Sequence, residues 1–169
     1  MSRNQVIELI RDIQNNPYGR RHIISFWHWA NIDKKALVEC AYETIWNVRN
    51  ENDKEYLDMM MVQRSGDMLT ASGPGGINEV QYAALLMMIA RHTGYEPGLF
   101  THVVANEQIY DRHMDAAEEM LKRGANMPEC KPYLVLNPEK NNFYEFTIDD
   151  FTMVDYEPIR PQLKLELGI

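Results

Sequence analysis

Hydrophobic positions near the start of the chain recur with the spacing of a helix. Val6, Ile10 and Ile13 would share one face of a helix that ends at a turn over residues 15–19. Residues 22–29 follow, rich in aromatic and β-branched side chains, and this composition is typical of a strand. The first thirty residues therefore predict a helix followed by a strand.

The pattern changes to strict alternation between residues 38 and 49. One side of this segment is mostly apolar and consists of Val38, Cys40, Tyr42, Thr44, Trp46 and Val48. A period of two predicts a strand with one apolar face, and it places Cys40 on that face. A polar connection at 50–54 and a second predicted strand at 56–65 complete a hairpin.

A nearly continuous apolar run over residues 79–92 predicts a buried helix. Asn78 stands at its cap position, with Gln81 three residues on, and Gly94 ends it. Further along we expect a strand at 99–105, an amphipathic helix at 111–123 and short strands at 133–136 and 151–157. Because strands and helices interleave without a strict βαβ rhythm, we expect a single α+β domain over residues 1–169, with helices packed on a mixed β-sheet.

Composition narrows the classes of partner. The formal net charge of −8 gives no support to a nucleic acid partner, although a local arginine cluster could still hold a small anion. No apolar run approaches the ~18 residues of a membrane span. The two cysteines, Cys40 and Cys130, form no metal-ligand spacing, so we expect no metal site and a reduced, cytoplasmic protein.

Candidate chemistry gathers around the predicted hairpin. Arg64 lies on the strand that would pair with that of Cys40, where its guanidinium could stabilise a thiolate. Arg20, Arg21, Arg64 and Ser65 could together cradle a phosphate, because arginine forks bind phosphate in a bidentate way. On the residues alone, a cysteine on an apolar strand face is more often a small core residue than a nucleophile.

Six segments in order carry a family resemblance. Residues 16–27 (NPYGRRHIISFW) resemble the NPxSRRxIxSxWN segment of thymidylate synthases, and residues 32–40 (IDKKALVEC) resemble their IDxxALxPC segment. The remaining four are 63–68 (QRSGDM), 78–83 (NEVQYA), 110–115 (YDRHMD) and 146–151 (FTIDDF), similar to QRSxDx, FNIAxYAxL, YxNHxD and FxxEDF. Each match alone is weak, but six in order across nearly the whole chain identify it as similar to this family.

The resemblance implies a role for each matched residue. Cys40 takes the place of the nucleophile that adds to carbon six of uracil, and Arg64 lies close to the thiolate. The implied nucleotide-binding residues are Arg64 and Ser65 at the phosphate, Asn78 at the uracil edge, and Gln108 and Tyr110 at the sugar. Gln63 is also expected to bind the substrate. Asp67 matches the aspartate that binds the pterin ring of the folate, and Gly168 and Ile169 match the C-terminal tail that closes over it.

The resemblance also implies the reaction and the assembly. The expected activity is the reductive methylation of dUMP to dTMP, with 5,10-methylenetetrahydrofolate as the co-substrate and no metal. Arg20 and Arg21 match the arginine pair that reaches into the phosphate site of the partner subunit, so a homodimer is expected. No nucleic acid and no membrane is required.

This sequence departs from the family pattern in three places. Glu39 stands where the family has proline before the nucleophile, and Gln108 stands where it has histidine two places before the tyrosine. The glycine-rich loop at 72–76 replaces the family's LGxPF. The family's N-terminal segment, with its catalytic glutamate, one phosphate-binding arginine and part of the folate pocket, is also absent from these 169 residues.

Three alternatives stay open at this point. A pyrimidine nucleotide hydroxymethylase would share the fold and the thiolate but deliver water instead of hydride; Asn78 favours uracil, whereas an acid there would favour cytosine. The absent N-terminal segment, Glu39 and Gln108 motivate a non-catalytic nucleotide-binding or dimerisation module. A Cys-His hydrolase ranks last, because the sequence places no histidine convincingly beside Cys40.

Overall fold

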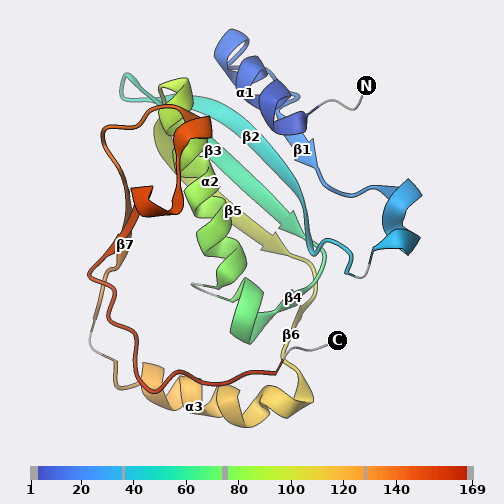
Figure 1. Ribbon diagram of the computed structural model, residues 1–169, viewed down its shortest axis with the longest axis vertical. Coiled ribbons are helices and arrows are strands. Elements are labelled where there is room, and N and C mark those ends of the chain that lie inside the picture. The colour runs from blue at the N-terminus through green and yellow to red at the C-terminus, as the bar shows by residue number, and fades with distance from the viewer. Residues whose placement is uncertain (1–3, 36, 74–75, 128, 167–169) are drawn as a thin grey trace.

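A four-stranded mixed sheet organises the computed structural model, which describes residues 4–35, 37–73, 76–127 and 129–166. The strands lie in the order β1-β2-β3-β5 (Figure 1). They comprise β1 (Ile23–Ser25), β2 (Ala41–Glu51), β3 (Lys54–Gln63) and β5 (Glu96–Val104). β1, β2 and β3 pair antiparallel, whereas β3 and β5 pair parallel, which confirms the α+β prediction.

The predicted hairpin forms β2 and β3. Its turn is made by Asn52 and Asp53, which both have positive φ values, of 53° and 61°, as the right-handed twist of a two-residue hairpin turn requires. Thr44, Trp46 and Val48 are buried, as the alternation predicts. On β3 the buried residues are Leu57, Met59, Met61 and Gln63, so both strands bury the same face of the sheet.

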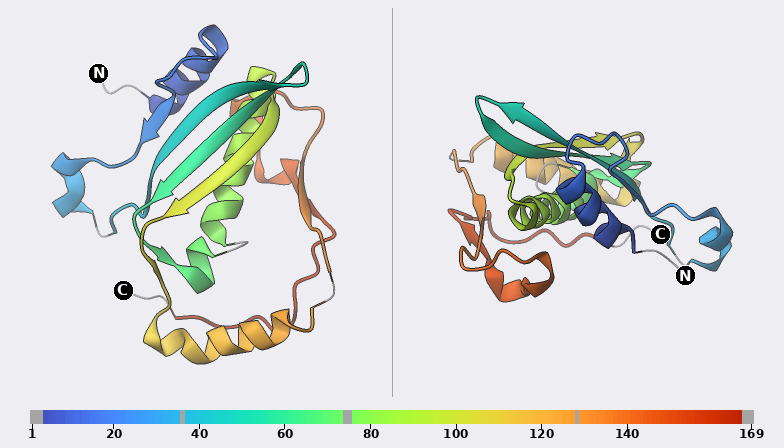
Figure 2. Two further views of the ribbon diagram at one scale, coloured as in Figure 1. Left: turned by 180° about the vertical axis from the view of Figure 1, so that it is seen from behind. Right: turned by 90° about the horizontal axis from the view of Figure 1, so that it is seen from above.

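Helix α2 (Ile77–Thr93) connects β3 to β5 and covers that buried face (Figure 2). Helix α1 (Gln5–Asn15) contributes Leu9, Ile10 and Ile13 to the same core. Gly94 ends α2 in the left-handed conformation, with φ of 85°, as predicted. The opposite face of the sheet exposes five apolar residues, Ile23, Ile45, Met60, Leu99 and Val103, and we call it the open face.

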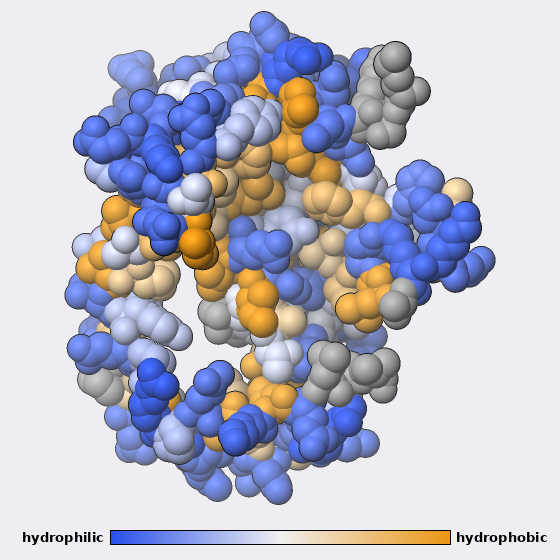
Figure 3. All heavy atoms as spheres, viewed as in Figure 1, coloured by the Kyte–Doolittle hydropathy of each residue, from blue (hydrophilic) through white to orange (hydrophobic). Residues whose placement is uncertain are grey.

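Smaller elements complete the chain. β4 (Gly66–Asp67) pairs with β6 (Glu107–Gln108), and β7 (Tyr133–Leu136) pairs with β8 (Phe151–Val154). Helix α3 (Met114–Gly124) lies away from the sheet, and Figure 3 shows open space between α3 and the layer that contains α2. Within the described residues, no helix is both long and apolar enough to cross a lipid bilayer.

The structure corrects three local predictions. The strand expected at 22–29 is limited to β1, and a 3₁₀ helix at Trp29–Lys34 follows it. Cys40 lies immediately before β2 rather than on it, because pairing with β3 begins at Ala41. Asn78 is inside α2 and not at its cap, since Gly76 occupies that position and the amide of Asn78 is hydrogen-bonded elsewhere.

Candidate active site

Cys40 and Arg64 meet at the open end of the hairpin. Ala41 pairs with Gln63, so the residue before β2 and the residue after β3 lie side by side. Nη2 of Arg64 lies 3.8 Å from Sγ of Cys40, and the backbone N–H of Arg64 donates to the Cys40 carbonyl over 2.9 Å. A fixed positive charge beside a partly exposed thiol is the arrangement that favours a thiolate.

Arg64 also holds the chain that leads to Cys40. Its Nε donates to the Glu39 carbonyl over 3.0 Å, and its Nη2 donates to the Val38 carbonyl over 2.9 Å. Its guanidinium carbon lies 6.0 Å from the ring centre of Trp27. The guanidinium therefore fixes the position of the thiol as well as its electrostatic surroundings.

The carboxylate of Glu39 does not oppose this arrangement. Lys35 donates a hydrogen bond to it, and this bond holds the pKa of the Glu39 carboxyl below its ordinary value. The charge of Glu39 is therefore paired with that of Lys35, four residues earlier in the chain. The departure at this position leaves Arg64 as the charged partner of Cys40.

A buried polar network lies beside the thiol, at the carboxyl ends of β3 and β5. Gln63 is fully buried, and its Oε1 accepts from Nδ2 of Asn78 over 3.1 Å and lies 3.0 Å from Nε2 of His102. Nε2 of Gln63 donates to the Ser65 carbonyl over 2.9 Å. The structure thus joins three of the predicted site residues, Gln63, Ser65 and Asn78, to one another.

Asp67 and Gln108 lie opposite each other in the parallel pair of β4 and β6. Asp67 begins a short turn of π-helix, where its carboxylate accepts from the Leu69 amide over 3.2 Å and from the Thr70 hydroxyl over 2.5 Å. Tyr110 follows two residues after Gln108 and packs edge-on against His113, with ring centres 5.5 Å apart. Asp67, Gln108 and Tyr110 therefore form a second group of predicted residues. Asp67 follows Ser65 by two residues, and the pairing of β4 with β6 brings Gln108 beside Asp67.

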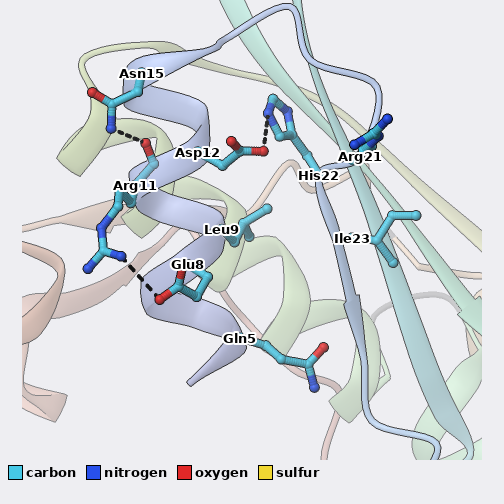
Figure 4. Close-up of a pocket in the computed structure, with 9 residues that line it drawn as sticks. All are labelled: Gln5, Glu8, Leu9, Arg11, Asp12, Asn15, Arg21, His22 and Ile23. Carbon is cyan, nitrogen blue, oxygen red and sulfur yellow. Dashed lines mark hydrogen bonds and ion pairs between the residues drawn. The ribbon is translucent and has the colours of Figure 1, made fainter. Parts of the chain in front are cut away.

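Arg20 and Arg21 lie far from Cys40 within the chain. The carbonyl of His22 accepts from the Trp46 amide, six residues along β2 from Cys40, a separation of roughly 20 Å at the rise of an extended strand. Arg21 lines a cavity of about 530 Å³ between α1 and β1, where Nε2 of the buried His22 lies 3.2 Å from Oδ2 of Asp12 (Figure 4). The four-residue phosphate cradle is therefore not formed within one copy of the chain.

Comparison with known proteins agrees with this geometry. The family model described as thymidylate synthase matches residues 1–169. The chain belongs to the thymidylate synthase family. A thymidylate synthase of Streptococcus agalactiae is 42% identical over 168 residues, covering 98% of this chain and 58% of the relative, and one of Streptococcus thermophilus is 43% identical over 163 residues, covering 95% and 55%.

A solved structure gives the same result for the fold. The thermostable thymidylate synthase A from Bacillus subtilis superposes with a TM-score of 0.78 at 37% sequence identity, over 95% of this chain and 54% of that one. The chain thus spans a little over half the length of the thymidylate synthases that it matches.

Sequence reasoning missed the two other members of the buried network. The sequence patterns assign no role to His102 or Glu79, yet Nδ1 of His102 lies 3.2 Å from Oε1 of Glu79. Alternation along residues 100–104 does place His102 on the inward face with Phe100, which was the available signal. Gly168 and Ile169 lie outside the described residues, and no cluster of three or more metal-ligating side chains occurs within the described ones.

Proposed function

We propose that this chain carries the thiolate chemistry of a thymidylate synthase, the reductive methylation of dUMP to dTMP with 5,10-methylenetetrahydrofolate. The observation that carries the proposal is the placement of Arg64 3.8 Å from Cys40, at the positions that the family resemblance assigns to the nucleophile and its cationic neighbour. The relatives at 42–43% identity are named thymidylate synthases, which favours this activity over hydroxymethyl transfer.

The reaction requires carbon five of the uracil ring to act as a nucleophile. Carbon five of uracil is a poor nucleophile until Sγ of Cys40 bonds to carbon six, which turns the ring into an enolate. That enolate attacks the methylene carbon of the folate, and carbon five then loses its proton as the bond between that methylene carbon and the folate nitrogen breaks, which leaves an exocyclic methylene group. The released tetrahydrofolate gives a hydride to this methylene group as the carbon–sulfur bond to Cys40 breaks, so dTMP and dihydrofolate are the products.

The residues around Cys40 supply binding and orientation. Arg64 and Ser65 bind the phosphate, Asn78 contacts the uracil edge, and Gln108 and Tyr110 bind the deoxyribose. Asp67 binds the pterin ring of the folate. Gln108 can both donate and accept a hydrogen bond, so it serves in place of the family's histidine at that position.

A homodimer completes the proposed site. Arg20 and Arg21 lie too far from Cys40 to reach its ligand, which suits a role in the phosphate site of a second copy. The apolar residues of the open face, Ile23, Ile45, Met60, Leu99 and Val103, provide a surface on which two copies can pair. Because the nucleophile acts as a free thiol and both cysteines are free, a reducing compartment such as the cytoplasm suits the reaction.

A mechanism-based trap tests the nucleophile. Fluorine at carbon five of deoxyuridylate cannot leave as a proton does, so with methylenetetrahydrofolate present we expect a covalent adduct that survives denaturation on the peptide containing Cys40. Cys40→Ser should abolish the adduct, whereas Cys130→Ser, at the exposed second cysteine, should leave it unchanged. Peptide mass spectrometry reads both outcomes.

The same reaction separates the alternatives. The trap is run on the chain alone and with the N-terminal portion of the Streptococcus agalactiae relative added. Labelling of Cys130 only, or of neither cysteine in both mixtures, would overturn Cys40 as the nucleophile and favour a non-catalytic nucleotide-binding or dimerisation module. With unfluorinated dUMP, a product heavier than dTMP by one oxygen would identify a hydroxymethylase instead.

A further inference from the structure

The buried network beside Cys40 extends further than the nucleotide-binding residues that the proposed function uses. It runs from Glu79 on α2, through His102 on β5 and Gln63 on β3, back to Asn78 on α2. The side chain of His102 is 8% exposed and Gln63 is fully buried, so protein atoms determine the hydrogen bonds that these two groups make. The family segment has isoleucine directly after the asparagine, where this chain has Glu79.

The contacts fix which atoms donate in this network. Nε2 of Gln63 donates to the Ser65 carbonyl, so Oε1 of Gln63 is the atom that faces Asn78 and His102. An amide oxygen can only accept, which requires a proton on Nε2 of His102. The 3.2 Å contact between Nδ1 and the Glu79 carboxylate requires a second proton between those two atoms. A neutral imidazole supplies only one proton, so the second proton of the pair lies between Nδ1 of His102 and the Glu79 carboxyl.

The fixed orientation of Gln63 determines that of Asn78. Nδ2 of Asn78 gives one proton to Oε1 of Gln63. Rotating the Asn78 amide by half a turn would place two oxygen acceptors against each other, with a buried acceptor losing a donor. The amide therefore has one preferred orientation, which leaves its other N–H and its oxygen in fixed positions.

That orientation discriminates between pyrimidines. Uracil presents an acceptor at position four and a donor at position three, whereas cytosine presents a donor at position four and an acceptor at position three. One orientation of an asparagine amide complements uracil, and only the rotated amide complements cytosine. A group that prevents the rotation therefore contributes to specificity by penalising the wrong base.

We propose that His102, held by Glu79, is a positioning residue that fixes Gln63 and, through it, the orientation of the Asn78 amide that selects a uracil over a cytosine nucleotide. This inference rests on the proposed function, in which Asn78 contacts the base. His102 does not itself touch the base.

The first experiment examines the pair without any ligand. In the full chain with ¹⁵N-labelled histidine, Nε2 of His102 should give the signal of a protonated nitrogen, because it faces the Gln63 oxygen. In Glu79→Gln the proton should stay on Nε2, because an amide can donate to Nδ1. Glu118→Gln makes the same change of charge at an exposed position on α3 and should leave the signals of His102 unchanged.

The second experiment measures discrimination. The ratio of dUMP to dCMP affinity, by titration calorimetry, should fall at least tenfold in His102→Leu, mainly through weaker dUMP binding. His92→Leu provides the matched control. His92 lies at the C-terminal end of α2, whereas Asn78 lies at its N-terminal end, and His92 accepts from the Phe143 amide over 3.2 Å. His102→Gln retains a donor for Gln63 and should restore most of the ratio, which a purely packing role would not explain.

The outcomes separate the inference from the proposed function. A His102→Leu ratio within twofold of the His92→Leu ratio, or a His102 ring without a proton on Nε2 in the unaltered chain, overturns the positioning role. A chain that binds neither nucleotide, alone or with the N-terminal portion of a relative, overturns the proposed function. In that case the ring nitrogen signals still decide whether Nε2 of His102 carries the proton that faces Gln63.

Discussion

Nη2 of Arg64 lies 3.8 Å from Sγ of Cys40 and, at the same time, 2.9 Å from the carbonyl oxygen of Val38. One guanidinium therefore orders the segment before the nucleophile and provides the positive charge beside it. A lysine could supply the charge but not the planar fork that reaches both carbonyls. The two roles of Arg64 can for this reason be separated by substitution.

Arg64→Lys should increase the hydrogen exchange of the residue-64 amide at least tenfold, because this amide donates to the Cys40 carbonyl and residues 38–40 lose the guanidinium that orders them. Hydrogen exchange read by mass spectrometry measures this directly. Arg49→Lys, at an arginine paired with Asp58 on the same hairpin, should leave exchange at residue 64 unchanged. Equal exchange in all three proteins would show that Arg64 does not order the segment.

Ile45→Glu should convert the proposed dimer to monomers. Ile45 and Met60 lie directly opposite each other on the open face, so a carboxylate there would be buried without a partner when two copies pair. Sedimentation velocity at several protein concentrations reads the result. Leu121→Glu places the same charge on α3, where Leu121 is 76% exposed, and should not change the sedimentation coefficient. An unaltered chain that stays monomeric with nucleotide present would refute the shared phosphate site.

Gly94→Ala should destabilise the chain by about 1 kcal/mol, because an L-residue with a side chain disfavours φ of 85°. For a chain of this size we expect a melting temperature lower by about 2–4 °C. Gly124→Ala, at the end of α3, meets no atom within 4 Å and has no positive φ, so it should be neutral or slightly stabilising. Thermal melting followed by circular dichroism distinguishes the two; equal shifts would exclude the backbone explanation.

Asp150→Asn should destabilise the chain near neutral pH, with a difference that shrinks in acid. Lys140 donates to the Asp150 carboxylate over 2.7 Å, and this bond, with those from Thr147 and Asn137, holds the pKa of Asp150 far below its ordinary value. A depressed pKa stabilises the folded state above the unfolded-state value of about 4, and this contribution is lost as the pH falls toward the folded value.

Urea midpoints at pH 7 and pH 3 test this pH dependence. Asp149→Asn, at the exposed neighbouring carboxylate, is the control and should show little difference at either pH. A gap between the unaltered chain and Asp150→Asn that is no smaller at pH 3 would contradict the assigned cause. The gap should be full above about pH 5, where the unfolded aspartate is also ionised.

Local patterns were sufficient for the elements that bury one face. Alternation predicted the hairpin, and the hairpin predicted that Arg64 lies beside Cys40, because both follow from pairing between neighbours in sequence. The cap assigned to Asn78 was wrong, since a side chain that is bound to Gln63 cannot also close the helix end. Nothing local indicated that contact, which depends on the start of α2 packing against the end of β3.

The parallel pairing of β3 with β5 has a consequence for folding. Met61 lies opposite His102, and Gln63 lies opposite Val104. A slip of β5 by one residue would turn His102 to the open face and deprive the buried Gln63 oxygen of one donor, at a cost of about 1–3 kcal/mol. Chains in the slipped register would thus be less stable and would also lack the hydrogen bond that fixes Gln63. Correct strand alignment and a competent site are, in this fold, acquired in the same step.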